Sequence, residues 1–95
     1  MASIGVLTLE LRLEHSHSLK DKRHVVLGLK QRLRNRFNVA VAEIDYQDLW
    51  QRALIAAVTV SSDHGRAEQV LQAAEKEASA LLGPDLVQAG VDWLE

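Results

Sequence analysis

The sequence lacks cysteine altogether, and it contains only one proline, two tryptophans, one tyrosine and one phenylalanine. Without cysteine, a disulfide framework, thiolate catalysis and the common structural zinc sites are all excluded. Because aromatic side chains are so few, the core has to be built from Leu, Val, Ile and Ala. We therefore expect a small protein with an aliphatic core.

Long apolar runs are also missing. No run approaches the length of a membrane span, and the first fourteen residues alternate with charges, which is unlike a signal peptide. A chain of 95 residues has the size of one domain. We expect a single domain over residues 1–95 in a cytoplasmic protein.

The net charge of −2 conceals a strong local asymmetry. Seven of the eleven basic residues fall within positions 20–36, where Asp21 is the only acid. A concentrated basic segment can attract a polyanion even in a chain that is acidic overall. The candidate nucleic-acid-binding residues are Lys20, Lys22, Arg23, Lys30, Arg32, Arg34 and Arg36.

Hydrophobic periodicity predicts two helices and four strands. Strict alternation predicts the first strand, with Leu7, Leu9, Leu11 and Leu13 facing inward. Ser18 and Asp21 resemble a capping box at the start of the first helix, and Gly83-Pro84 ends the second. The predicted strands are residues 4–14, 37–44 with a bulge near its end, 52–61 and 86–94; the predicted helices run from 18 to 36 and from 62 or 63 to 82.

This order of elements predicts an α+β, ferredoxin-like βαββαβ sandwich of two layers, with an antiparallel sheet in the order 4-1-3-2. Both helices then cover one face of the sheet, and the opposite face stays open and apolar. Uncovered apolar faces often mark protein–protein contacts. The candidate dimer-interface residues on this face are Ile4, Val6, Ile55 and Ala57.

The segment DYQDLWQR, residues 45–52, is predicted to be a loop that leads into the third strand. Its candidate partner-binding residues are Tyr46, Gln47, Trp50 and Arg52. Trp50 has two interpretations, because it can anchor a partner or close the end of a core that is poor in aromatics. We favour core closure for Trp50, which leaves Tyr46 and Gln47 as the exposed contacts.

No pattern in the sequence indicates catalysis, a metal or a cofactor. His15, His17 and His24 have no third ligand at a defined spacing, and no serine, histidine and acid form a recognisable triad. Familiar RNA-binding modules are absent too, since the open sheet face has no aromatic residues for stacking and no glycine pair has GxxG spacing. We therefore expect a protein that binds without catalysing a reaction.

Three motifs resemble the YlxP-like family of small bacterial proteins, a domain of unknown function. They are S-L-K-x-K-R at Ser18–Arg23, R-F-N-V at Arg36–Val39 and D-L-W-Q-R-A at Asp48–Ala53. The resemblance implies a ferredoxin-like fold. Genes of this family often lie beside those for transcription and translation factors and a ribosome-maturation factor, so it also implies a role with RNA or the ribosome. It implies no catalytic residues.

Two functional hypotheses follow from the sequence. The first is a non-enzymatic protein that binds RNA or the ribosome through its basic first helix. The alternative is a homodimeric protein-interaction or small-ligand-binding module that acts through the apolar open face of its sheet.

Overall fold

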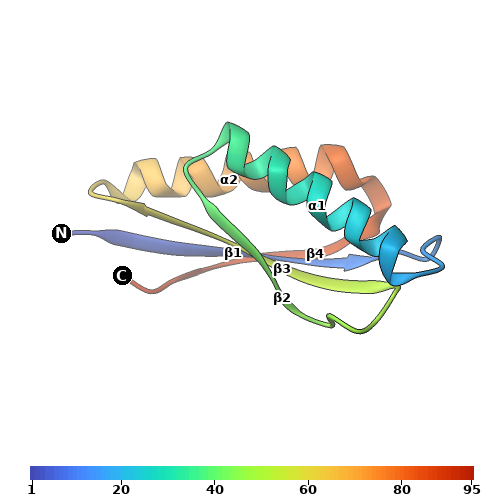
Figure 1. Ribbon diagram of the computed structural model, residues 1–95. Helices are drawn as coiled ribbons and strands as arrows, with labels where there is room; N and C mark the ends of the chain where they lie inside the picture. Colours follow the sequence, from blue (N-terminus) through green and yellow to red (C-terminus); the bar gives the residue numbers. More distant parts are fainter.

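The computed structural model describes residues 1–95 and has the predicted order of elements (Figure 1). One antiparallel sheet has the strand order β2-β3-β1-β4, which is 4-1-3-2 when read from the other edge. The ferredoxin-like fold is thus confirmed. The elements are β1 (Ser3–Arg12), α1 (Leu19–Arg36), β2 (Ala40–Asp45), β3 (Arg52–Ser61), α2 (His64–Leu82), a 3-10 turn (Gly83–Asp85) and β4 (Leu86–Trp93).

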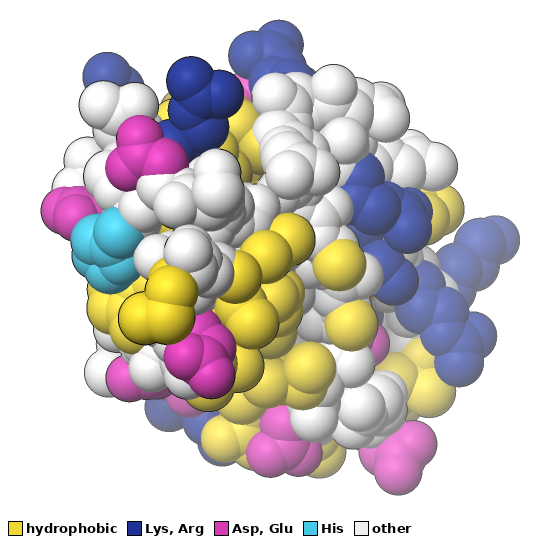
Figure 2. Space-filling view, turned by 90° about the vertical axis from the view of Figure 1, so that its left-hand side faces the viewer, with side chains coloured by type: hydrophobic (Ala, Val, Ile, Leu, Met, Phe, Trp, Pro, Cys, Tyr) yellow, Lys and Arg dark blue, Asp and Glu magenta, His cyan; other side chains and the backbone are white.

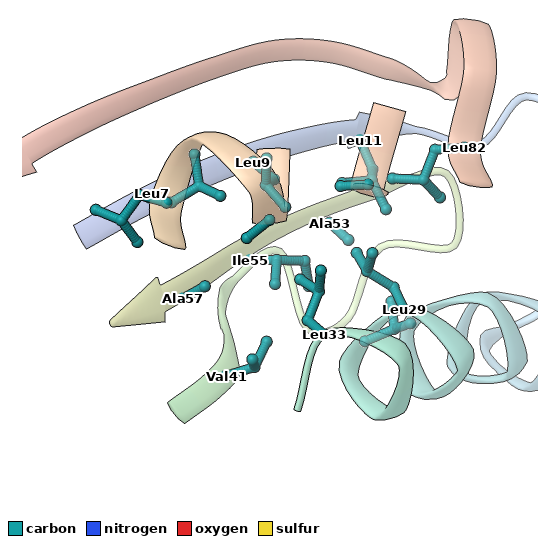
Figure 3. Close-up of a cluster of buried hydrophobic side chains, with 14 of the residues drawn as sticks. Leu7, Leu9, Leu11, Leu29, Leu33, Val41, Ala53, Ile55, Ala57 and Leu82 are labelled. Carbon is teal, nitrogen blue, oxygen red and sulfur yellow. The ribbon is translucent and has the colours of Figure 1, made fainter. Parts of the chain in front are cut away.

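The two helices lie side by side on one face of the sheet, and the other face carries no covering layer (Figure 1). Between helices and sheet, the four leucines that alternate from Leu7 to Leu13 are at most 3% exposed. Figure 3 shows the labelled leucines of β1 in one layer with Leu29 and Leu33 of α1. The inward leucine face predicted from alternation is confirmed.

The prediction that Ile55 and Ala57 of β3 lie on the open face of the sheet is wrong. Ile55 and Ala57 are fully buried in the core and are unavailable to a dimer partner (Figure 3). They pair with Leu9 and Leu7, so they share the inward side of β1. Both alternating sets of residues in β3 are apolar, and alternation therefore cannot tell which set faces the helices.

The predicted signals at the ends of the elements act as expected, but some strands are shorter than predicted, and β1 ends at Arg12 and not at residue 14. The Ser18 hydroxyl accepts a 3.0 Å hydrogen bond from the Asp21 amide at the start of α1. A change of register between Glu43 and Asp45 confirms the bulge in β2. β2 begins at Ala40 and not at Phe37, because the Phe37 amide still bonds to the last turn of α1.

Three connections gather at one end of the sheet, at the start of α1. The Leu13 amide donates a 2.9 Å hydrogen bond to the Gln51 carbonyl, which joins the β1–α1 connection to the β2–β3 loop. Leu11 pairs with Leu86, where the 3-10 turn enters β4. This end of the molecule therefore combines the amino end of α1 with the aromatic-bearing loop.

Candidate functional site

Helix α1 has two basic flanks, and they differ in their surroundings. Arg32 and Arg36 face α2, where their guanidinium groups lie 3.3 and 2.8 Å from one Glu77 carboxylate oxygen. Both arginines keep substantial solvent exposure. Their charges are nevertheless opposed by an acid, so they attract a polyanion less strongly than free cations do.

The opposite flank carries Lys20, Arg23, Lys30 and Arg34, which we call the α1 basic flank. The spacing of three or four residues places these side chains along one side of the helix. None of the four has a carboxylate within 4.0 Å, and all except the half-buried Lys30 are exposed. From first to last residue the flank spans about 21 Å at the rise of an α-helix.

Figure 2 views the molecule from the end that carries both termini and shows Lys and Arg side chains gathered along one side, where α1 runs. An exposed leucine, Leu27, interrupts the α1 basic flank near its middle. Four of the seven candidate residues, namely Lys20, Arg23, Lys30 and Arg34, therefore share one flank of α1. Whether they bind nucleic acid remains a prediction.

Lys22 cannot belong to a nucleic-acid surface, because only 1% of it is exposed. Its position on the helix is on the same side as Val26 and Leu29, toward the sheet. The Lys22 ammonium donates hydrogen bonds of 2.7, 3.1 and 3.3 Å to the carbonyls of Tyr46, Gln47 and Arg52. The inclusion of Lys22 among the nucleic-acid-binding residues was wrong.

The same ammonium lies 3.0 Å from the Glu43 carboxylate oxygen Oε2. That oxygen is buried and has no hydrogen-bond partner. An ammonium group has three protons, and the three carbonyls account for them, so the contact with Glu43 is an ion pair without hydrogen-bond alignment. Lys22 and Glu43 thus join α1, β2 and the β2–β3 loop through a largely buried charge pair.

The β2–β3 loop is held by several further bonds. Tyr46 adopts a left-handed conformation with φ of 65°, and the Asp45 carboxylate accepts a 2.7 Å hydrogen bond from its amide. The Gln51 side-chain amide donates to the carbonyls of Glu14 and Ser16, at 3.2 and 3.3 Å. The bonds of Gln51 tie the end of the loop nearest to β3 to the β1–α1 connection.

Arg52 and Tyr46 contact each other. The guanidinium carbon lies 4.0 Å from the centre of the Tyr46 ring, and Nη2 donates a 3.0 Å hydrogen bond to the tyrosine hydroxyl. Nη2 also lies 3.3 Å from a carboxylate oxygen of Glu10, while the buried Nε of Arg52 has no partner. Tyr46 and Arg52, two of the predicted partner-binding residues, therefore make their polar contacts within the protein. Gln47, a third, is exposed.

The prediction that Trp50 closes the core is wrong, because 53% of this residue is exposed. Leu13 and Leu82 are buried at that end of the core. Beside Trp50, Leu49 is 46% exposed, and a surface depression of about 430 Å³ is lined by residues 48–52. Sequence reasoning missed Leu49, although an adjacent Leu-Trp pair within an otherwise polar loop was a visible signal.

The open face of the sheet is apolar only in part, because Glu10 of β1 and Gln88 and Asp92 of β4 also lie on it. Its apolar part differs from the prediction. Ile4 and Val6 lie there, half-buried. β3 contributes Leu54, Ala56, Val58 and Val60 in place of the buried Ile55 and Ala57. One row across all four strands consists of small residues, namely Ala42, Ala56, Thr8 and Gly90.

The structure brings no group of three or more His, Asp or Glu side chains together in a way that could hold a metal ion. His15, His17 and His24 are all exposed. Neither helix combines the length and the apolar character that a bilayer span requires.

Comparisons with known structures support the fold. The de novo designed protein Foldit4 matches all of this chain and 98% of its own, with a TM-score of 0.62 and 10% identity. A dimeric ferredoxin-like protein of unknown function from Thermobifida fusca YX matches 96% of this chain and 90% of its own, with a TM-score of 0.50 and 14% identity. At these identities the likeness concerns the fold alone.

Comparisons of sequence extend further. The uncharacterized protein YlxP of Bacillus subtilis (strain 168) is 41% identical over 69 residues, which cover 73% of this chain and 75% of that protein. The family model described as "Protein of unknown function (DUF503)" matches residues 4–87 and so includes all three motifs that indicated a resemblance to YlxP-like proteins. The chain belongs to the DUF503 family, the family of YlxP-like proteins.

Proposed function

We propose that this protein is a non-enzymatic RNA-binding protein whose α1 basic flank contacts the phosphates of a structured RNA. The observation that carries the proposal is the division of cations on α1. The Glu43 carboxylate pairs with Lys22 and that of Glu77 with Arg32 and Arg36, but Lys20, Arg23, Lys30 and Arg34 have no carboxylate within 4.0 Å. Unpaired cations along one rigid helix are suited to contact successive phosphates.

The mode of binding follows from what the surface lacks. Reading of single-stranded bases on a sheet requires aromatic side chains, and the strands place aliphatic and polar residues, but no aromatic one, on the open face of this sheet. Recognition through the backbone and shape of a folded RNA, or docking on the ribosome, fits a straight basic helix better. Such binding depends on counterion release and falls steeply with salt, and four contacts correspond to a slope of log K against log salt of about −3.

The test compares two variants that remove equal charge. Lys20→Gln/Arg23→Gln/Arg34→Gln loses three cations from the α1 basic flank. The control, Arg12→Gln/Arg66→Gln/Lys76→Gln, loses three exposed cations elsewhere. Each changes the net charge from −2 by −3, to −5.

Binding of labelled ribosomal RNA fragments and small ribosomal subunits is measured across a salt series. We expect the flank variant to lose most of its affinity and its salt slope to fall to about −1, the value for one remaining contact. The control should keep the wild-type slope. Equal losses in both variants, or weak binding by the wild-type protein at low salt, would contradict the proposal.

A second candidate function is homodimerisation through the open sheet face. The observation in its favour is the aliphatic cluster of Ile4, Val6, Val58 and Val60 on that face, of which Val60 is 55% exposed. Four strands of this length offer a face of about 600 Å², close to the roughly 800 Å² per partner of a standard interface. The Thermobifida fusca protein of similar fold is dimeric.

Sedimentation over a range of protein concentrations tests this candidate. We expect a concentration-dependent dimer in the wild-type protein and a monomer for Val58→Lys, because a lysine there would bury its charge in the interface. A wild-type monomer at all concentrations would exclude it. RNA binding by α1 is measured separately, so either function can fail alone.

A further inference from the structure

The β2–β3 loop and the adjoining end of β2 expose large apolar side chains that have no role in the core. Ile44, Leu49 and Trp50 are about half exposed, at 50%, 46% and 53%. None of the three is part of the hydrophobic core cluster. Single exposed apolar residues are ordinary, but three within seven positions, two of them in the loop and Ile44 at the end of β2, form a concentrated apolar surface.

Both favourable contacts and unfavourable local features accompany the shape of this loop. The buried Lys22 ammonium donates hydrogen bonds to the carbonyls of Tyr46 and Gln47 in the loop and of Arg52 at the start of β3. Tyr46 takes a left-handed conformation that side-chain-bearing residues rarely adopt. The buried Nε of Arg52 has no partner. Such features persist where the surroundings impose them, and they concentrate at sites of recognition.

Rigidity of this kind favours binding. A loop that is already ordered loses little conformational freedom when a partner arrives. Tryptophan is among the residues that most often dominate binding energy at protein interfaces. The exposed Trp50 and Leu49, which line a surface depression of about 430 Å³, therefore have the form of a preformed anchor.

The charges around the tip indicate the chemistry of the partner. Asp45, Asp48 and Glu14 are exposed there. Arg52 is paired with Glu10 and stacked on Tyr46. The exposed Arg12 lies opposite Arg52 in the sheet, and the three carboxylates outnumber it. An acidic rim repels phosphate and attracts lysine and arginine, so it disfavours RNA as the occupant of this surface.

We infer that the β2–β3 loop is a docking site for a second protein, through a segment that is apolar at its centre and basic at its edges. Leu49 and Trp50 supply the apolar anchor, and Asp45 and Asp48 supply the complementary charge. This site is separate from the α1 basic flank. The molecule then offers a basic surface to RNA and an acidic, apolar surface to a basic protein.

The experiment uses the full-length protein labelled with ¹⁵N and three defined probes. The first is an amphipathic Leu/Lys peptide of about four helical turns, the second is the same peptide with Glu in place of Lys, and the third is a structured ribosomal RNA fragment. The indole signal of Trp50 reports on the loop. Trp93, which pairs with Gly5 at the far end of the sheet, serves as an internal reference.

The Leu/Lys peptide should shift the signals of residues 44–52 and the Trp50 indole in a saturable way, while Trp93 and the α1 basic flank stay unchanged. The Leu/Glu peptide should leave the loop unaffected. Leu49→Ser/Trp50→Ser, which keeps every charge, should weaken the Leu/Lys peptide at least about tenfold, the loss expected when a hot-spot aromatic residue is removed. The matched control, Leu81→Ser/Val87→Ser, removes two exposed apolar side chains elsewhere and should bind as the wild type does.

Four outcomes would overturn the inference. They are the absence of saturable shifts at millimolar peptide, shifts centred on the open sheet face, equal binding by wild type and Leu49→Ser/Trp50→Ser, and shifts of the Trp50 indole by RNA. The last would assign the loop to the RNA surface. Loss of RNA binding in the α1 variant does not affect these measurements, so the two proposals fail separately.

Discussion

The ammonium of Lys22 donates a 2.7 Å hydrogen bond to the carbonyl of Tyr46, which lies 24 positions away and has a left-handed backbone. This contact fastens the first turn of α1 to the β2–β3 loop. Lys20 and Arg23, which lie two positions before and one position after Lys22 in the helix, belong to the α1 basic flank. One buried lysine thus holds together the two surfaces to which we assign binding.

Replacement of Lys22 should show that it acts mainly as one half of a charge pair. We expect Lys22→Met to lower the free energy of unfolding by about 3 kcal/mol, because Glu43 and three carbonyls lose their partner. The double variant Lys22→Met/Glu43→Leu should recover part of this loss, since no largely buried charge is then unpaired. Urea denaturation of the wild type, both single variants and the double variant measures the coupling. Strictly additive losses would contradict the pairing.

Gly28 should tolerate alanine with a gain in stability. It lies within α1, and a Cβ atom there would meet nothing within 4 Å. Because glycine is the less favourable residue in a helix, Gly28→Ala should raise the free energy of unfolding by about 0.5–1 kcal/mol.

Gly83→Ala is the matched control, since its Cβ also has open space but its φ is +57°. We expect it to lower stability by about 1–3 kcal/mol, the cost of a strained backbone. Urea denaturation compares the two variants. A loss of stability in Gly28→Ala would mean that its surroundings are more crowded than the structure indicates.

Gly5 allows the indole of Trp93 to lie across the sheet. A Cβ atom at Gly5 would come within 2.6 Å of Leu71 Cδ1 and 2.7 Å of Trp93 Cζ3. Gly5→Ala should therefore lower the free energy of unfolding by about 1–3 kcal/mol through overpacking. Gly5→Ala/Trp93→Leu should recover part of this loss by removing the indole ring, one of the two side chains that would clash with the new Cβ atom. Unchanged thermal stability in Gly5→Ala would contradict this packing.

The exposure of Trp50 can be tested through stability alone. Trp50→Ala should change the free energy of unfolding by no more than about 0.5 kcal/mol, as substitutions at the surface usually do. Leu33→Ala, in the core, should cost about 2–5 kcal/mol. Thermal unfolding of both variants makes the comparison. A loss of stability in Trp50→Ala as large as that in Leu33→Ala would mean that Trp50 packs in the core.

Much of the fold could be predicted because the relevant signals are local. Alternating leucines identified the inward face of β1, and the Ser18 cap and Gly83 marked helix ends. The register shift in β2 was visible as a break in its alternation. Each of these depends on residues within a few positions of one another, so pattern and structure agree.

The errors arose where local patterns allow two answers. Ile55 could face either side, since both sides of β3 are apolar, and only pairing with β1 places it in the core. Trp50 could close the core or project from it, and the loop bonds made by Lys22 and Gln51 fix the shape that projects it.

The sequence by itself determined the order of elements, the ferredoxin-like topology and the concentration of positive charge on α1. Periodicity and capping act over a few residues, and the order of elements then restricts how the strands can pair. Only the tertiary structure decided which cations are free. Lys22 and Arg34 are both basic residues of one helix, but one lies toward the sheet and meets Glu43, while the other faces solvent. Basic side chains are available to a polyanion only where the fold leaves them exposed and without an acidic partner.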